Sequence, residues 1–148
     1  MSTQTVRFHR ILRAPPQRIY RAFVEARAFE RWLPPFGFVG QVHDMEAVVG
    51  GRWRMSFTNF SSGHSHSFGG RYLELVPGER ICYDARFDDP QLSGTMKTSV
   101  TLTAVSCGTS VHIVQDGLPE VIPAEMCCLG WQESLVALAQ LVEPDIPG

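Results

Sequence analysis

The segment PAEMCCLGWQESLVALAQLV, residues 123–142, decides the fold because it predicts one long amphipathic helix. Pro123 suits the start of a helix, and Pro144 follows its end. One face carries a broad apolar stripe, formed by Cys127, Trp131, Leu135, Leu138 and either Leu141 or Val142. A helix of ~20 residues is about 30 Å long, close to the span of a strand of nine residues. The segment is therefore expected to lie along a sheet.

Upstream of this helix, turn signals divide the chain at hairpin intervals, as at Gly50-Gly51, Pro77-Gly78 and Cys107-Gly108. Strands are predicted over residues 4–13, 39–48, 52–60, 66–75, 80–87, 95–105 and 110–116. Short connections join antiparallel neighbours, so a meander is expected. Between the first two strands, apolar residues at helical spacing from Gln17 to Val24 and from Phe29 to Leu33 predict two short helices.

The dimensions of these elements predict a cavity. Seven strands at about 4.8 Å spacing make a sheet some 30 Å wide, whereas a helix is only about 10–12 Å across. The sheet must curl around the helix, and the short helical pair fills only part of the opening. Residues 1–148 are therefore expected to form one α+β domain, a curved antiparallel sheet of six to seven strands around the C-terminal helix.

Alternation along the strands predicts which side chains line the cavity. Strand 66–75 has apolar residues on both faces, so either face of it fits the pattern; we place Phe68, Gly70 and Tyr72 inward. Asn59, Gln115 and a tyrosine would orient the ligand, since pockets combine apolar walls with a few polar groups. The predicted ligand-binding residues are Trp53, Met55, Phe57, Asn59, Phe68, Tyr72, Tyr83, Phe87, Gln115, Cys127, Trp131 and Leu135.

Composition excludes several functional classes. A net charge of −2 and a pI near 6.2 give no electrostatic basis for binding nucleic acid or an anionic membrane. The chain has no apolar run of the roughly 18 residues that a membrane span needs, and residues 1–10 lack the apolar core of a signal peptide. A cytoplasmic location is therefore expected. The four cysteines (Cys82, Cys107, Cys127, Cys128) are then expected to be free, buried thiols. A homodimer fits the size but is not required.

Few residues are candidates for metal binding or catalysis. His64 and His66 would share one strand face, but two histidines are too few for a metal site. We therefore expect the pair to lie in a solvated hairpin. Acid–base catalysis would have to use His66, Tyr72, Tyr83 or Glu133. Glu133 lies some 200° around the helix from Trp131 and is expected in water. Because the chain lacks a phosphate loop and a dinucleotide fingerprint, no cofactor is expected.

Nearly the whole chain resembles the START-like helix-grip (SRPBCC) superfamily. The matching segments are APPQRIYRAFVEARAFERWL (14–33), VVGGRWRMSF (48–57), GGRYLELVPGERICY (69–83), the Gly108-Thr109 turn and GWQESLVALAQL (130–141). Within it, the chain resembles the branch of the activator of a heat-shock chaperone ATPase and of polyketide cyclase-like proteins. The resemblance implies a site between the long helix and the concave sheet. Relatives often have histidine where this chain has Cys127 and Gln115.

Three functions remain open at the level of sequence. The first is a carrier, sensor or sequestering protein for a small apolar or aromatic molecule, such as a lipid or a polyketide-like compound. The second is an enzyme of the cyclase or hydratase kind, in which a tyrosine or His66 moves protons. The third is a chaperone-associated interaction module, which should show a large exposed apolar or charged patch.

Overall fold

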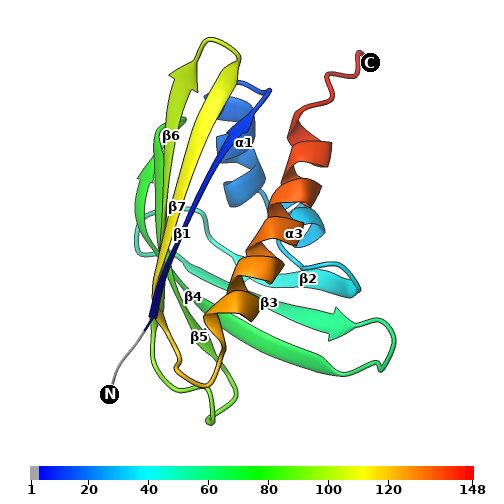
Figure 1. The fold of residues 1–148 in the computed structure, drawn as a ribbon, viewed down its shortest axis with the longest axis vertical. Helices are drawn as coiled ribbons and strands as arrows, with labels where there is room; N and C mark the ends of the chain where they lie inside the picture. Colours follow the sequence, from blue (N-terminus) through cyan, green and yellow to red (C-terminus); the bar gives the residue numbers. More distant parts are fainter. Residues whose placement is uncertain (1–3) are drawn as a thin grey trace.

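The computed structural model describes residues 4–148 and contains one seven-stranded antiparallel sheet with three helices in that range (Figure 1). The strands are β1 Gln4–Leu12, β2 Phe38–Met45, β3 Arg52–Asn59, β4 Ser65–Val76, β5 Arg80–Phe87, β6 Met96–Val105 and β7 Gly108–Leu118. The helices are α1 Pro16–Val24, α2 Ala26–Trp32 and α3 Ala124–Val142. The α+β class, the antiparallel sheet, the two short helices and the long C-terminal helix are confirmed.

The strands from β2 to β7 form the expected meander, and β1 joins it at the far edge. The order is β1-β7-β6-β5-β4-β3-β2, with β1 paired to β7 from Gln4 opposite Leu118 to Leu12 opposite Thr109. Since β2 lies at the opposite edge, α1 and α2 carry the chain across the open side of the sheet. Glu25 is extended and separates these two helices, which gives the bent pair that the sequence predicts.

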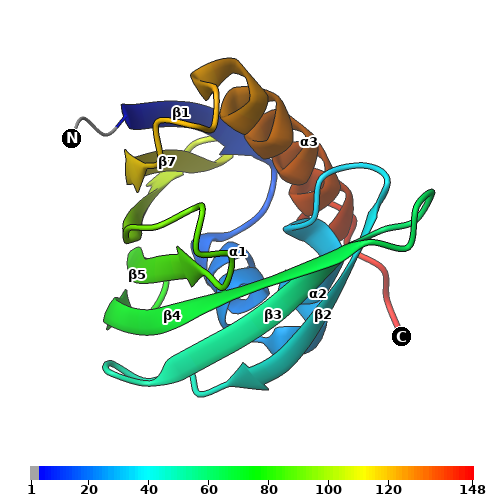
Figure 2. The same ribbon diagram turned by 90° about the horizontal axis from the view of Figure 1, so that it is seen from below.

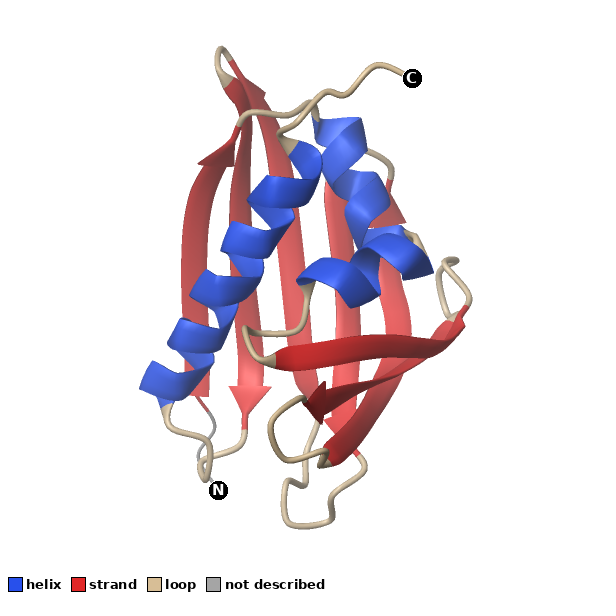
Figure 3. Cartoon of the chain, turned by 90° about the vertical axis from the view of Figure 1, so that its right-hand side faces the viewer, coloured by secondary structure: helices blue, strands red, loops and turns tan. Residues whose placement is uncertain are grey.

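The sheet curls strongly, so that β2, β3 and β4 turn toward α3 and enclose the helices (Figures 2 and 3). A β-bulge between Tyr72 and Glu74 accompanies this bend in β4. Before the bulge, Phe68 and Tyr72 are buried. Leu73 lies in the bulge and is 43% exposed, and after it Leu75 pairs with the buried Ile81. The bulge therefore explains why the apolar residues of this strand fall on both faces in the sequence, and it supports the inward placement of Phe68 and Tyr72.

The helices complete the core. Trp32 from α2 donates its indole N–H to the Ala22 carbonyl oxygen at 2.8 Å, and this bond fixes α2 against α1. Helix α3 buries Trp131, Leu138 and Val142, whereas Leu141 is 37% exposed, so the apolar stripe ends on Val142. No helix in residues 4–148 is both long enough and apolar enough to cross a membrane.

The four cysteines are free, but only one of them is buried as expected. Cys82 lies on β5 in the sheet and is buried. Cys107 is exposed because it occupies the turn between β6 and β7. Cys127 and Cys128 are half-buried, since they occupy the first turns of α3, at the edge of the helix's contact with the sheet.

Candidate functional site

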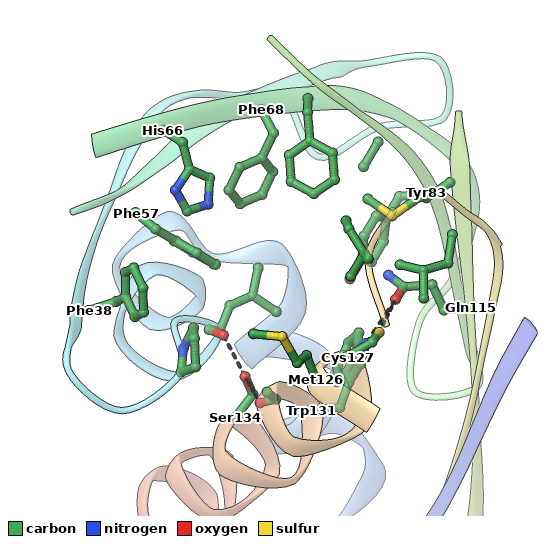
Figure 4. Close-up of a pocket in the computed structure, with 18 of the residues that line it drawn as sticks. Phe38, Phe57, His66, Phe68, Tyr83, Gln115, Met126, Cys127, Trp131 and Ser134 are labelled. Carbon is green, nitrogen blue, oxygen red and sulfur yellow. Dashed lines mark hydrogen bonds between the residues drawn. The ribbon is translucent and has the colours of Figure 1, made fainter. Parts of the chain in front are cut away.

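A pocket of about 330 Å³ lies between α3 and the concave face of the sheet (Figure 4). Eight of the predicted ligand-binding residues line it: Trp53, Phe57, Phe68, Tyr83, Phe87, Gln115, Cys127 and Trp131. Alternation places the strand residues there because successive side chains point to opposite faces. The lining contains no Asp, Glu, Lys or Arg. Its walls are therefore mainly apolar and aromatic.

An aromatic wall from β2, β3, β4 and β5 closes one side of the pocket. Phe57 and Phe68 lie edge to face with ring centroids 4.8 Å apart. His66 contacts both rings and also Phe38 and Phe87, at centroid distances of 5.7–6.3 Å. Partial burial among these rings lowers the pKa of His66. At neutral pH the imidazole is therefore uncharged.

A polar cluster at Gln115 lies on the opposite side, where α3 meets β7. The Gln115 Oε1 atom accepts hydrogen bonds from Trp131 Nε1 at 3.1 Å and from Cys127 Sγ at 3.3 Å. The Gln115 Nε2 atom donates to Thr98 Oγ1 on β6 at 3.1 Å. Burial raises the pKa of the Cys127 thiol to about 11. Thus Cys127 and Gln115 contact each other where α3 meets β7.

Tyr83 lies on β5 at the inner end of the pocket and is 5% exposed. Burial raises the pKa of its phenol well above the ordinary value, although a hydrogen bond with Thr98 acts in the opposite direction. The phenol therefore stays protonated at neutral pH. General acid–base catalysis works best when the pKa lies near the working pH, so Tyr83 is poorly suited to that role.

Four of the predicted residues lie outside the pocket lining. Asn59 is used by its own turn, because its Oδ1 accepts the backbone N–H groups of Ser61 and Ser62 at 2.9 and 3.3 Å. Tyr72 donates its hydroxyl to the Phe23 carbonyl oxygen at 3.2 Å, under α1. Met55 and Leu135 are buried in the hydrophobic core and do not reach the pocket.

The lining also includes residues that were not predicted as ligand-binding. They are Leu33, Pro35, Phe38, His66, Ala85, Met96, Leu118, Ile122, Met126, Gly130 and Ser134. Helical spacing would have indicated Gly130 and Ser134, which lie three residues after Cys127 and Trp131. Strand alternation places Ala85 with Tyr83. Leu33, Pro35 and Ile122 come from connections between elements, where neither periodicity applies, whereas Phe38, Met96 and Leu118 are the end residues of their strands.

Two other candidates have clear positions. Glu133 was expected in water, but it is half-buried and its Oε1 accepts the Phe36 backbone N–H at 3.0 Å. This bond joins α3 to the segment between α2 and β2. His64 and His66 are both exposed; His64 lies in the β3–β4 turn, while the ring of His66 borders the pocket. Within residues 4–148, no three or more His, Cys, Asp or Glu residues are grouped as a metal site requires.

Comparisons with known proteins agree with this architecture. A family model described as Activator of Hsp90 ATPase homolog 1-like protein matches residues 13–143. A crystal structure of a protein from Chromobacterium violaceum is 58% identical, with a TM-score of 0.94, covering 95% of this chain and 98% of that one. A search of curated proteins gave no match.

More distant structures share the fold. A protein from Rhodobacter sphaeroides is 19% identical with a TM-score of 0.80, covering 94% of this chain and 96% of that one. A protein from Rhizobium leguminosarum is 21% identical with a TM-score of 0.78, covering 97% of both chains. At these identities the similarity concerns the arrangement of the backbone only.

Proposed function

This chain belongs to the Activator of Hsp90 ATPase homolog 1-like family, and we propose that it binds a small, neutral, apolar or aromatic molecule in the pocket beside α3. The observation that carries the proposal is the pocket's lining, which has aromatic walls and no charged side chain. Such a site favours apolar ligands, and burying a charged group in it without a partner is costly. A carrier, sensor or sequestering protein would all use this pocket.

The titratable groups of the lining support a neutral ligand. Burial lowers the pKa of His66 and raises the pKa values of Tyr83 and Cys127, so all three groups are uncharged near pH 7. An anionic ligand would find no cation in this lining, and a cationic ligand would find no carboxylate. Affinity is then expected to come from apolar area and ring contacts.

Native mass spectrometry of freshly purified protein tests the proposal, with a pocket-filling variant for comparison. Gly130 lines the pocket on α3, and a Cβ atom there would meet open space. Gly130→Leu is therefore expected to occupy the pocket without displacing the backbone. Gln132→Leu is the matched control because it adds the same side chain at an exposed position on the same helix.

The expected result is a discrete added mass on the wild-type protein that disappears on denaturation. The same mass should persist on Gln132→Leu and be absent from Gly130→Leu. Equilibrium dialysis against 2-acetylnaphthalene, a neutral aromatic probe, should give the same order of binding. A clean protein mass together with no uptake of the probe would contradict the proposal and favour a role in contacting other proteins.

A further inference from the structure

Exposed apolar side chains gather around the opening of the pocket. Met126 lines the pocket and is nevertheless 67% exposed, so its side chain lies at the opening. Figure 4 shows it extending from α3 toward the side of the pocket where Phe38 lies. Within residues 4–148, nine large apolar side chains are more than half exposed, and six of these lie in residues 34–42, 56–70 and 119–134: Phe36, Val39, Phe60, Val121, Met126 and Leu129.

Hydrogen bonds join these three segments into one surface. The Phe36 backbone N–H donates to Glu133 Oε1 at 3.0 Å, which attaches the segment after α2 to α3. The Phe60 N–H donates to the Gly37 carbonyl oxygen at 3.0 Å, which attaches the β3–β4 turn to the same segment. On α3, Leu129 lies one turn before Glu133 and therefore on the same side of the helix. The exposed apolar residues of the three segments are thus neighbours.

The same surface carries an excess of negative charge. The β5–β6 connection borders it, because Phe87 and Met96 at the two ends of that connection line the pocket. We call residues 34–42, 56–70, 87–95 and 119–134 the collar. All thirteen lysine and arginine residues lie elsewhere in the chain. The collar has a formal charge of −5 with histidine neutral, whereas the whole chain has −2, and its five acidic residues are Asp88, Asp89, Glu120, Glu125 and Glu133.

This charge distinguishes between the possible partners of the collar. Exposed apolar area around a pocket is typical of a site of association, and complementary charge selects the partner. A second copy of this chain would place its own five carboxylates against the first five, which disfavours self-association through the collar. Membrane-binding segments combine apolar residues with Lys and Arg, which the collar lacks. A partner that is both apolar and basic complements both properties.

We propose that the collar docks a basic amphipathic segment of another protein. The apolar side of this segment covers Phe36, Met126 and Leu129, and its Lys or Arg side chains face the surrounding carboxylates. Amphipathic helices bind in this way, with an apolar stripe against the receptor and charged residues along the flanks. Docked there, the segment covers the opening of the pocket. The inference goes beyond the proposed function and does not require that the pocket be occupied.

Two peptides of matched pattern test the charge preference. One is an amphipathic helix of leucine and lysine, and the other has glutamate at every lysine position. Fluorescence anisotropy should show that wild-type protein binds the lysine peptide about tenfold more tightly or better, and added salt should weaken this binding. Glu125→Lys should weaken it about three- to tenfold. Glu79→Lys makes the same change at an exposed position in the β4–β5 turn, outside the collar, and should keep the wild-type affinity.

A second pair of variants tests the apolar contact on α3. Leu129→Gln removes an apolar side chain that is 57% exposed in the collar, so the lysine peptide should bind about tenfold more weakly. Leu141→Gln is the control, because Leu141 is 37% exposed near the other end of the same helix. It should bind the peptide like the wild type.

Several results would overturn the inference. They are failure of the lysine peptide to bind, equal binding of the two peptides, and equal losses in a variant and its control. A wild-type dimer that dissociates in Leu129→Gln during analytical ultracentrifugation would assign the collar to a second copy instead. Binding to phosphatidylcholine vesicles that is lost in Leu129→Gln would assign it to a membrane. Each of these results leaves the proposed function standing, since uptake of 2-acetylnaphthalene by the pocket is measured separately.

Discussion

Gln115 joins three elements through one amide. Its oxygen accepts from Trp131 and Cys127 on α3, and its nitrogen donates to Thr98 on β6. The residue is 9% exposed, so water cannot readily replace these bonds. The sequence suggested that Gln115 would orient a ligand. In the structure, most of its hydrogen-bonding capacity instead holds α3 against the sheet.

Gln115→Leu should therefore destabilise the fold. The substitution leaves the Trp131 and Thr98 polar groups buried without this partner, which is expected to lower the free energy of unfolding by about 2–3 kcal/mol. Urea unfolding followed by circular dichroism measures the change. Gln140→Leu is the control, because Gln140 is exposed on the same helix and its change should stay within about 0.5 kcal/mol. Equal effects of the two substitutions would show that the hydrogen bonds of Gln115 make no net contribution to the free energy of unfolding.

His66 should make stability depend on pH in a defined direction. Burial lowers its pKa in the folded state, so below the unfolded pKa of about 6.5 the unfolded chain binds more protons. The contribution of neutral His66 is fully present above that pH and is lost as the pH falls toward the folded pKa. Urea unfolding of wild type and His66→Gln between pH 7 and pH 5 should show a smaller loss of stability in the variant.

His64→Gln is the matched control for this experiment, since His64 lies exposed in the adjacent turn. It should keep the wild-type dependence on pH. If His66→Gln and wild type lose stability in parallel, burial of the imidazole has no energetic consequence and the side chain is effectively solvated.

At the scale of elements, Gly130 lies within the continuous helix α3, and no close contact in the fold requires a glycine there. A Cβ atom there would meet nothing within 4 Å. Gly130→Ala should therefore raise the free energy of unfolding by about 0.5–1 kcal/mol, because glycine costs that much inside a helix. Thermal unfolding measures the gain.

Gly70 provides the opposite case on β4. A methyl group at this position would overlap the backbone of Asp84 on β5, at the place where the sheet bends. Gly70→Ala should therefore cost about 1–3 kcal/mol through displacement of the strands. A neutral Gly70→Ala would mean that the two strands separate easily, and that the curvature does not depend on their close approach.

The same elements show what the sequence could predict and what it could not. Helical and strand periodicity located every element, since burial of one face imposes that pattern. Periodicity could not show that β1 pairs with β7, because pairing at a distance leaves no local signal. It also could not locate the bulge after Tyr72, so the sequence did not decide which face of β4 points inward. Alternation found Trp53, Phe57 and Tyr83 in the pocket, but it could not reveal that Asn59 is used by its own turn.

For the whole molecule, occupancy of the pocket should appear as added stability. A ligand that binds only the folded state raises the free energy of unfolding by about 2.7 kcal/mol at one hundred times its Kd. Titration with 2-acetylnaphthalene should therefore raise the Tm of the wild type and of Gln132→Leu, but leave Gly130→Leu unchanged. An equal rise in all three proteins would place the probe elsewhere on the surface.

The pairing of β1 with β7 has a consequence for the time course of folding. Its partners lie roughly 100 residues apart in the chain, as in the pair Leu12 and Thr109, and contacts of such long sequence separation slow folding. At synthesis rates of about 5–20 residues per second, β1 emerges from the ribosome about 5–20 s before β7. We therefore expect closure of the sheet to be the last step of folding. Until then the first strand of the nascent chain has two unpaired edges, and this interval is when the protein is most exposed to aggregation.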